Sequence, residues 1–165
     1  MLARDYCTDP IKPVVLSHHM LMGLKQGQAK MSKSELDSAI FMEDTEADVQ
    51  RKIKKGFCPE QVVVDNPIID YTKYIIFPSF EDEMTLDIKT EAGTEKRTYK
   101  SYAAFEADYL KGAIHPNDLK PAVAAYINRL LQPVRSHFTN DPYARKLLET
   151  IKRWQQELAD GNKLR

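Results

Sequence analysis

The sequence predicts a mainly α-helical protein with one small β-hairpin, preceded by a short piece of α/β structure. Three observations predict this. The longest apolar pattern, residues 119–138, keeps helical spacing throughout. Met84, Leu86 and Ile88 alternate with polar residues, as in a strand with one buried face. Residues 14–16 (VVL) form a continuous apolar run that indicates a buried strand near the start of the chain.

Breakers and caps divide the first half of the chain into short elements. Residues 1–9 are expected to end a helix, because Pro10 and Pro13 follow them. Residues 17–34 are rich in Gly, Gln, Lys and Ser and lack periodicity, so they predict a loop, and residues 38–42 (SAIFM) predict a short extended piece. Thr45 with Asp48 has the spacing of a capping box, which predicts a helix ending at Gly56.

Similar signals mark the remaining elements. Asn66 before Pro67 predicts a helix that Pro78 closes. A turn at residues 92–93 and a weak returning strand near residues 97–100 complete the hairpin. The other expectations are a short helix capped by Ser101 and ended by Gly112, a loop at residues 115–118, a kink at Pro133 in the long helix, and a last helix from Asp141-Pro142 to about Leu158.

The composition is that of a globular chain without overall charge. Of its residues 42% are hydrophobic, and 24 cations balance 24 acidic groups, so a nucleic-acid surface has to be local. Residues 51–55 hold four cations and predict either a contact for phosphates or a solvated helix face. Cys7 and Cys58 cannot form a disulfide framework, and no signal peptide or membrane-spanning run is recognisable, so a cytoplasmic protein is expected.

The pentapeptide of residues 30–34 (KMSKS) is the most informative motif. It sets Lys30 and Lys33 in a loop with small hydroxyl neighbours. Two movable ammonium groups suit a clamp on a polyphosphate, because they can follow charge onto a leaving pyrophosphate. A lysine-rich surface loop without function is the alternative reading of these five residues alone.

The flanks of this motif give it a family context. KMSKS is the second active-site motif of class I aminoacyl-tRNA synthetases, and the chain resembles the tyrosyl enzymes of archaea and eukaryotes from about Met1 to about Trp154. The stretches that carry the resemblance are VVLSHHMLMGL, SAIFMEDTEADVQRKIKKGFCP, NPIIDYTKYIIFP, TYKSYAAFEADY and HPNDLKPAVAAYINRLLQPVRSHF. The resemblance implies that residues 1–44 hold the last strand and KMSKS loop of a Rossmann-like catalytic domain. Residues 45–165 then form a helical anticodon-binding domain.

The resemblance also implies roles for individual residues. Catalytic lysines are expected at Lys30 and Lys33, in tyrosine activation by ATP with Mg²⁺ as the counter-ion of the nucleotide. The expected ATP-binding set is Met20, Leu21, Lys30, Met31, Ser32, Lys33 and Ser34. His18 and His19 are expected to form a wall of the nucleotide pocket. A protein-bound metal is not expected, because the two histidines have only distant cysteines as companions.

In the helical part, the resemblance implies an anticodon-binding set of His115, Pro116, Asn117 and Asp118. Asp118 is then the group that recognises the first anticodon guanine, through hydrogen bonds that its carboxylate accepts, while His115 stacks on an unpaired base. The alternative is that these residues only cap the long helix. The second stacking residue usual in this family is missing from residues 91–95 (EAGTE).

The implied partners are tRNA-Tyr, ATP and tyrosine, in a full-length enzyme that is dimeric or pseudo-dimeric. The 165 residues contain no His-x-Gly-His, the first motif of the family, and no recognisable tyrosine pocket. The chain is therefore expected to be the C-terminal part of a synthetase and inactive alone. A free-standing RNA-binding module that retains the KMSKS loop is the alternative.

Overall fold

The computed structural model describes residue 14 and residues 16–32, 35–90 and 93–162. Its elements are η1 (Leu36–Ser38), α2 (Glu46–Lys55), α3 (Pro67–Tyr71), the π-helical η2 (Thr72–Ile76), α4 (Phe77–Ser79), β1 (Met84–Thr90), β2 (Gly93–Tyr99), α5 (Tyr102–Leu110), α6 (Pro116–Asn140) and α7 (Pro142–Asn162). β1 and β2 form an antiparallel hairpin in which Met84 pairs with Tyr99 and Thr90 with Gly93. The predicted mainly α fold with one small hairpin is confirmed.

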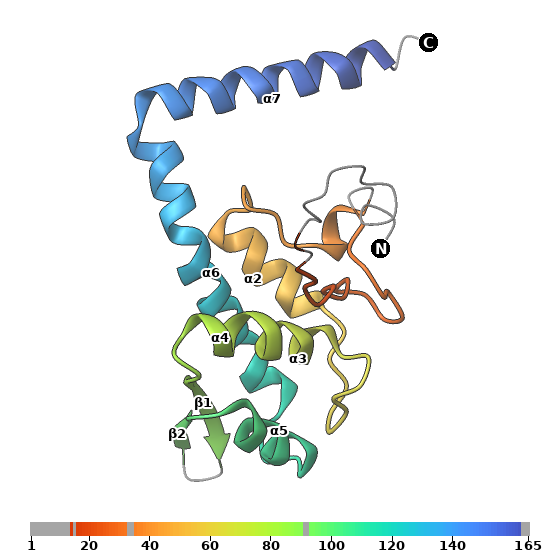
Figure 1. The fold of residues 1–165 in the computed structure, drawn as a ribbon, viewed down its shortest axis with the longest axis vertical. Coiled ribbons are helices and arrows are strands. Elements are labelled where there is room, and N and C mark those ends of the chain that lie inside the picture. Colours follow the sequence, from red (N-terminus) through yellow and green to blue (C-terminus); the bar gives the residue numbers. More distant parts are fainter. Residues whose placement is uncertain (1–13, 15, 33–34, 91–92, 163–165) are drawn as a thin grey trace.

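Helix α6 is the centre of the molecule. It packs against α2, α3, η2, β1 and α7. Figure 1 shows the hairpin and α7 at opposite ends of the long axis, with α6 running between them. The core contains the apolar faces of α2 and α6 and the inner face of β1; Val49, Ile53, Leu119, Val123, Met84 and Leu86 are all at most 1% exposed. The alternation in β1 and the helical spacing in α6 therefore predicted these core residues correctly.

Several predicted helix boundaries are confirmed by their caps. The Thr45 hydroxyl accepts from the backbone of Asp48, whose carboxylate accepts in return from the Thr45 backbone N–H, so α2 starts with a capping box. The Asn66 side chain accepts from the N–H groups of Ile68 and Ile69. Ser101 caps α5 in the same way. Each cap satisfies donors that the first helical turn leaves without a partner.

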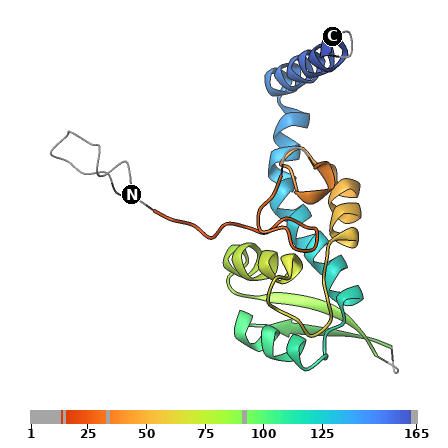
Figure 2. The same cartoon turned by 90° about the vertical axis from the view of Figure 1, so that its right-hand side faces the viewer.

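Of the strand expected at residues 14–16, Val14 and Leu16 are described, and neither belongs to a strand. Val14 is 88% exposed and Leu16 is 80% exposed, and the red-orange stretch that begins at residue 16 leaves the helical body as an extended arm (Figure 2). A strand needs a neighbour for its backbone hydrogen bonds, and the strands among the described residues, β1 and β2, pair with each other. Of the extended piece expected at residues 38–42, Ala39 does have extended backbone angles, while Ser38 is the last residue of η1. The helix expected at residues 1–9 lies outside the described residues.

Two helix ends differ from the prediction. Pro78 does not close the helix that begins at Pro67, which continues to Ser79. The π-helical turn changes the pairing just before this proline, where the Phe77 N–H donates to the Thr72 carbonyl. Helix α6 begins at Pro116 rather than near Leu119, because proline is favoured at the first helical position and His115 caps the turn. The helix continues through Pro133, and α7 extends to Asn162.

No helix in the described ranges is both long enough and apolar enough to span a membrane.

Candidate functional site

The KMSKS segment is held against the helical body at its base. Leu24 is 1% exposed, its N–H donates to the Ser38 carbonyl, and its own carbonyl accepts from the Phe57 N–H just after α2. The buried Ser38 hydroxyl donates to the Ser32 carbonyl at 3.1 Å. These bonds fix the start of the motif, where Lys30 is exposed and Met31 packs against the core. Lys33 and Ser34 lie outside the described residues. Sequence reasoning missed Ser38, since a lone serine carries no recognisable signal.

A second anchor holds the residues ahead of the loop. Asp70 on α3 accepts from the Met22 N–H at 3.0 Å and lies 2.7 Å from His19 Nε2. The His19 ring also stacks on Tyr74, with 3.7 Å between the ring centroids. Asp70 lies 51 residues from His19 in sequence, so no local pattern could have identified it.

The two residues expected near the adenine follow directly on this anchor. Met20 is 64% exposed, while Leu21 is half-buried against the core. Among the described residues, no group of three or more His, Cys, Asp or Glu is placed to hold a metal ion. The segment therefore presents a docked backbone with an exposed Met20 and an exposed Lys30.

The basic run of α2 is mostly engaged within the protein. Lys52 is 3% exposed, and its ammonium donates to both Asp44 carboxylate oxygens and to the Ala39 carbonyl. Arg51 and Lys55 both reach the Asp37 carboxylate, which holds the pKa of Asp37 below its usual value. Neither interpretation of residues 51–55, a phosphate contact or a solvated helix face, describes Lys52, because its ammonium group lies in a buried ion pair with Asp44. Only Lys54 of the four lacks a carboxylate partner in the described part of the chain.

The expected loop at residues 115–118 is instead the cap and first turn of α6. His115 Nδ1 accepts from the Asn117 N–H at 3.1 Å, so in the neutral ring the proton is on Nε2, which lies 2.8 Å from Glu60 Oε1. The neutral His115 Nε2–H can thus donate to Glu60, and the two contacts fix the orientation of the ring. Pro116, Asn117 and Asp118 are helical.

Asp118 is not a helix cap. It is the third residue of α6, it is 8% exposed, and its Oδ2 accepts from the Lys89 N–H of β1 at 3.3 Å. The cap interpretation therefore holds for His115, which is the N-cap of α6, but not for Asp118. A carboxylate in the first turn is favoured by the helix dipole.

Asp118 lines a hollow between α6 and the hairpin, here called the Asp118 hollow. Its volume is about 420 Å³, and its wall also includes Asp87, Lys89, Lys96, Asn117 and Tyr126. A buried carboxylate beside an open hollow can accept hydrogen bonds from a planar donor edge such as that of guanine. His115 is not part of this wall, so the structure does not bring the whole predicted set into one cavity.

Comparison with known proteins identifies the family of the chain. The family model "tRNA synthetases class I (W and Y)" matches residues 1–132. The chain is similar to tyrosine–tRNA ligase 1, cytoplasmic, of Arabidopsis thaliana, with 53% identity over 94% of this chain and 40% of the relative. It is similar to the tyrosine–tRNA ligase of Thermococcus onnurineus, with 37% identity over 91% of this chain and 44% of the relative.

Solved structures show the same similarity. The Leishmania major tyrosyl-tRNA synthetase in complex with tyrosinol matches 94% of this chain and 31% of its own, with a TM-score of 0.79 and 41% identity. The Pyrococcus horikoshii tyrosyl-tRNA synthetase complexed with L-tyrosine matches 90% of this chain and 46% of its own, with a TM-score of 0.75 and 31% identity. The chain spans less than half the length of each of these four proteins. The resemblance inferred from KMSKS and its flanks is confirmed, and the chain belongs to the class I tRNA synthetases of the tryptophan and tyrosine group.

Proposed function

We propose that this chain supplies the KMSKS loop and the anticodon-reading part of a tyrosine–tRNA ligase, which activates tyrosine with ATP and transfers it to tRNA-Tyr. The observation that carries the proposal is the joint occurrence of two features in one chain of this family. The KMSKS segment is docked on the helical body, and a buried carboxylate opens into a hollow at the start of α6. The Arabidopsis relative is named cytoplasmic, and this chain is proposed to act in the same compartment.

In this proposal, Lys30 and Lys33 act during adenylate formation. Their ammonium groups stabilise the negative charge that develops on the phosphates when the tyrosine carboxylate displaces pyrophosphate. Met20 and Leu21 contribute backbone near the adenine, and Met31, Ser32 and Ser34 complete the ATP-binding set. A magnesium ion, when bound, accompanies the phosphates of ATP and neutralises part of their charge. Ser38 and Asp70 keep the two ends of this segment in place.

The second part of the proposal concerns the anticodon, with residues 45–165 as the binding domain and residues 1–44 as part of the catalytic domain. Asp118 accepts hydrogen bonds from the Watson–Crick edge of the first anticodon guanine. His115 offers a flat ring whose orientation Glu60 and Asn117 fix. Pro116 and Asn117 form the turn between them. The full-length enzyme is proposed to be dimeric or pseudo-dimeric.

Asp118→Asn tests this reading in the 165-residue chain. The oxygen of the asparagine can still accept a hydrogen bond from the Lys89 N–H. Its NH₂ group is a donor, however, and cannot accept hydrogen bonds from the N–H groups of guanine. We expect the variant to fold normally and to lose about 10- to 100-fold of its preference for an anticodon stem-loop with guanine over one with adenine at the first position. This range corresponds to about 1–3 kcal/mol for a bidentate base contact.

The measurement is the dissociation constant of each stem-loop by fluorescence anisotropy, with the urea midpoint as the folding control. Asp87→Asn, another carboxylate of the same hollow, is the matched control variant. An unchanged guanine preference in Asp118→Asn would remove Asp118 as the reader.

The runner-up function is a free-standing RNA-binding module without catalysis. Its support is that the walls of the Asp118 hollow come from residues 85–126 and include no residue of the KMSKS segment. Both functions predict guanine-selective RNA binding, and they differ in whether the Lys30–Lys33 loop contributes to adenylate formation.

A further inference from the structure

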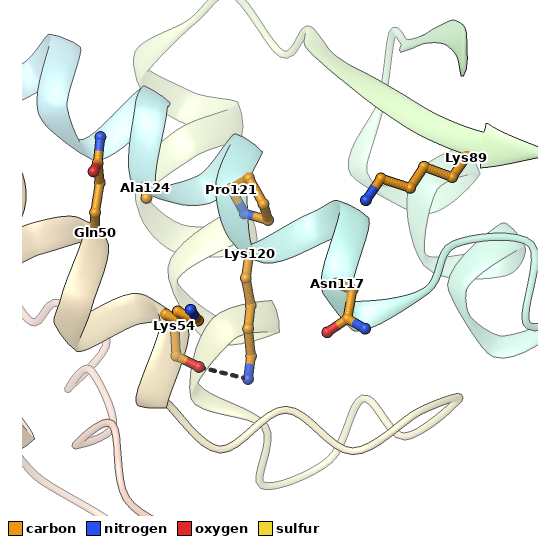
Figure 3. A pocket seen from close by; sticks show the side chains of 7 residues that line it. All are labelled: Gln50, Lys54, Lys89, Asn117, Lys120, Pro121 and Ala124. Atoms are coloured by element: carbon orange, nitrogen blue, oxygen red, sulfur yellow. Dashed lines mark hydrogen bonds between the residues drawn. The ribbon is translucent and has the colours of Figure 1, made fainter. Parts of the chain in front are cut away.

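A second hollow, here called the lysine groove, adjoins the start of α6. Its volume is about 490 Å³, and Lys54 of α2, Lys89 of β1 and Lys120 of α6 line it together with Gln50 and Asn117. Figure 3 shows these side chains arriving from three different elements. The Lys120 ammonium donates to the Lys54 carbonyl at 3.1 Å, which joins α6 to the end of α2. The residues that line this groove include no carboxylate.

The three lysines differ from the neighbouring cations of α2. Arg51, Lys52 and Lys55 each have a carboxylate partner within 4.0 Å. Within the described ranges, Lys54, Lys89 and Lys120 have none. Among the described residues, three lysines without an ion pair thus line one groove. Like charges that share a groove repel one another, and an anion bound between them removes that repulsion.

The groove shares part of its wall with the Asp118 hollow. Lys89, Asn117 and Pro121 belong to the walls of both, while Asp118 belongs only to the hollow. One hollow therefore offers a hydrogen-bond acceptor suited to a base edge, and its neighbour offers cations suited to phosphate. This is the division that a nucleotide requires, since phosphate contacts position a nucleic acid and base contacts specify its sequence.

We propose that the lysine groove binds the sugar–phosphate backbone of the single-stranded loop whose base Asp118 reads. This inference rests on the proposed function and adds to it the three residues that position the RNA. Successive phosphates fit better than one free phosphate, because the cations come from three elements along the groove rather than converging on one point (Figure 3). Lysine ammonium groups are point charges, so they contribute affinity without distinguishing one base from another.

The test is the salt dependence of stem-loop binding by the 165-residue chain. Replacing Lys54, Lys89 and Lys120 together by Gln removes three phosphate contacts, and each contact contributes about 0.7 to the slope of log K against log salt for single strands. We expect the slope to become shallower by about 2. When the salt is lowered from 1 M to 0.1 M, the affinity of the wild type should therefore rise about 100-fold more than that of the variant. The ratio of affinities for the guanine and adenine loops should stay unchanged.

The matched control removes three cations of α7, in the variant Arg145→Gln, Lys146→Gln, Lys152→Gln, at the far end of the molecule (Figure 1). If both triple variants change the slope equally, the groove has no specific role and the proposal falls. A different result is that the wild type binds both loops equally well and that only the groove variant has a shallower slope. In that case the phosphate role of the groove is upheld, and base reading by Asp118 fails. If the groove variant loses base preference and keeps its slope, the proposed phosphate role is wrong. Equal urea midpoints of the variants exclude unfolding as the cause.

Discussion

Lys52 is the residue whose role changes most between the sequence and the structure. It lies in a run of four cations that suggests a phosphate contact, yet its ammonium is enclosed by Asp44 and the Ala39 carbonyl. Burial of one charge without its partner is very costly, whereas a well-bonded pair comes close to balancing its desolvation. The pair therefore fixes the segment after η1 against α2 and is not available to a ligand.

At this scale, Asp44→Ala is expected to lower the free energy of unfolding by about 3–5 kcal/mol, because it leaves the Lys52 ammonium buried without a counter-charge. The measurement is urea denaturation followed by circular dichroism. Asp37→Ala is the control, since its partners Arg51 and Lys55 are exposed, and an exposed ion pair contributes little to stability. Equal losses in the two variants would contradict a special role for the buried pair.

The KMSKS loop is the element whose function depends most on what holds it. Ser38 bonds the Ser32 backbone, Leu24 joins the segment to η1 and to the end of α2, and Asp70 holds the Met22 backbone. The base of the loop is thus tied to the helices, while Lys30 remains exposed.

In a synthetase that contains this segment, Lys30→Ala and Lys33→Ala are each expected to lower the rate of adenylate formation by about 10²-fold, with a smaller effect on tyrosine affinity. The reason is that the ammonium groups stabilise charge that develops in the transition state. Pre-steady-state kinetics of adenylate formation provide the measurement. Lys25→Ala is the matched control, because Lys25 lies in the same segment but forms an exposed pair with Glu35. Rates within two- or threefold of wild type in the Lys30 and Lys33 variants would leave the loop without a catalytic role.

On the scale of the whole molecule, α6 joins the proposed functional regions. Its first turn carries Asp118 and its middle packs on α2, which receives the base of the KMSKS segment. Arg135 and Asn128 of α6 also bond the backbone around the start of α2. The helical body and the KMSKS segment are therefore parts of one packed structure.

The 165-residue chain alone is expected to bind the anticodon stem-loop but not to catalyse tyrosine-dependent exchange between ATP and pyrophosphate. The reason is that its sequence holds KMSKS but no His-x-Gly-His and no recognisable tyrosine pocket. The exchange assay uses protein freed from host synthetase, with an intact tyrosine–tRNA ligase as the positive control. Robust exchange by the chain would contradict the division of labour proposed here.

The sequence by itself determined most of the helices, the hairpin and the family. Caps such as Thr45-Asp48 and Asn66-Pro67 are local devices, and side-chain period follows from backbone geometry, so neighbouring residues suffice to predict them. Only the tertiary structure decided which charges are free and where the site residues lie. Asp44 and Lys52 are eight residues apart, whereas His115 and Glu60 are 55 apart and Lys89 and Asp118 are 29 apart. The lysine groove likewise draws on α2, β1 and α6, which become neighbours only when the apolar faces of these elements pack together.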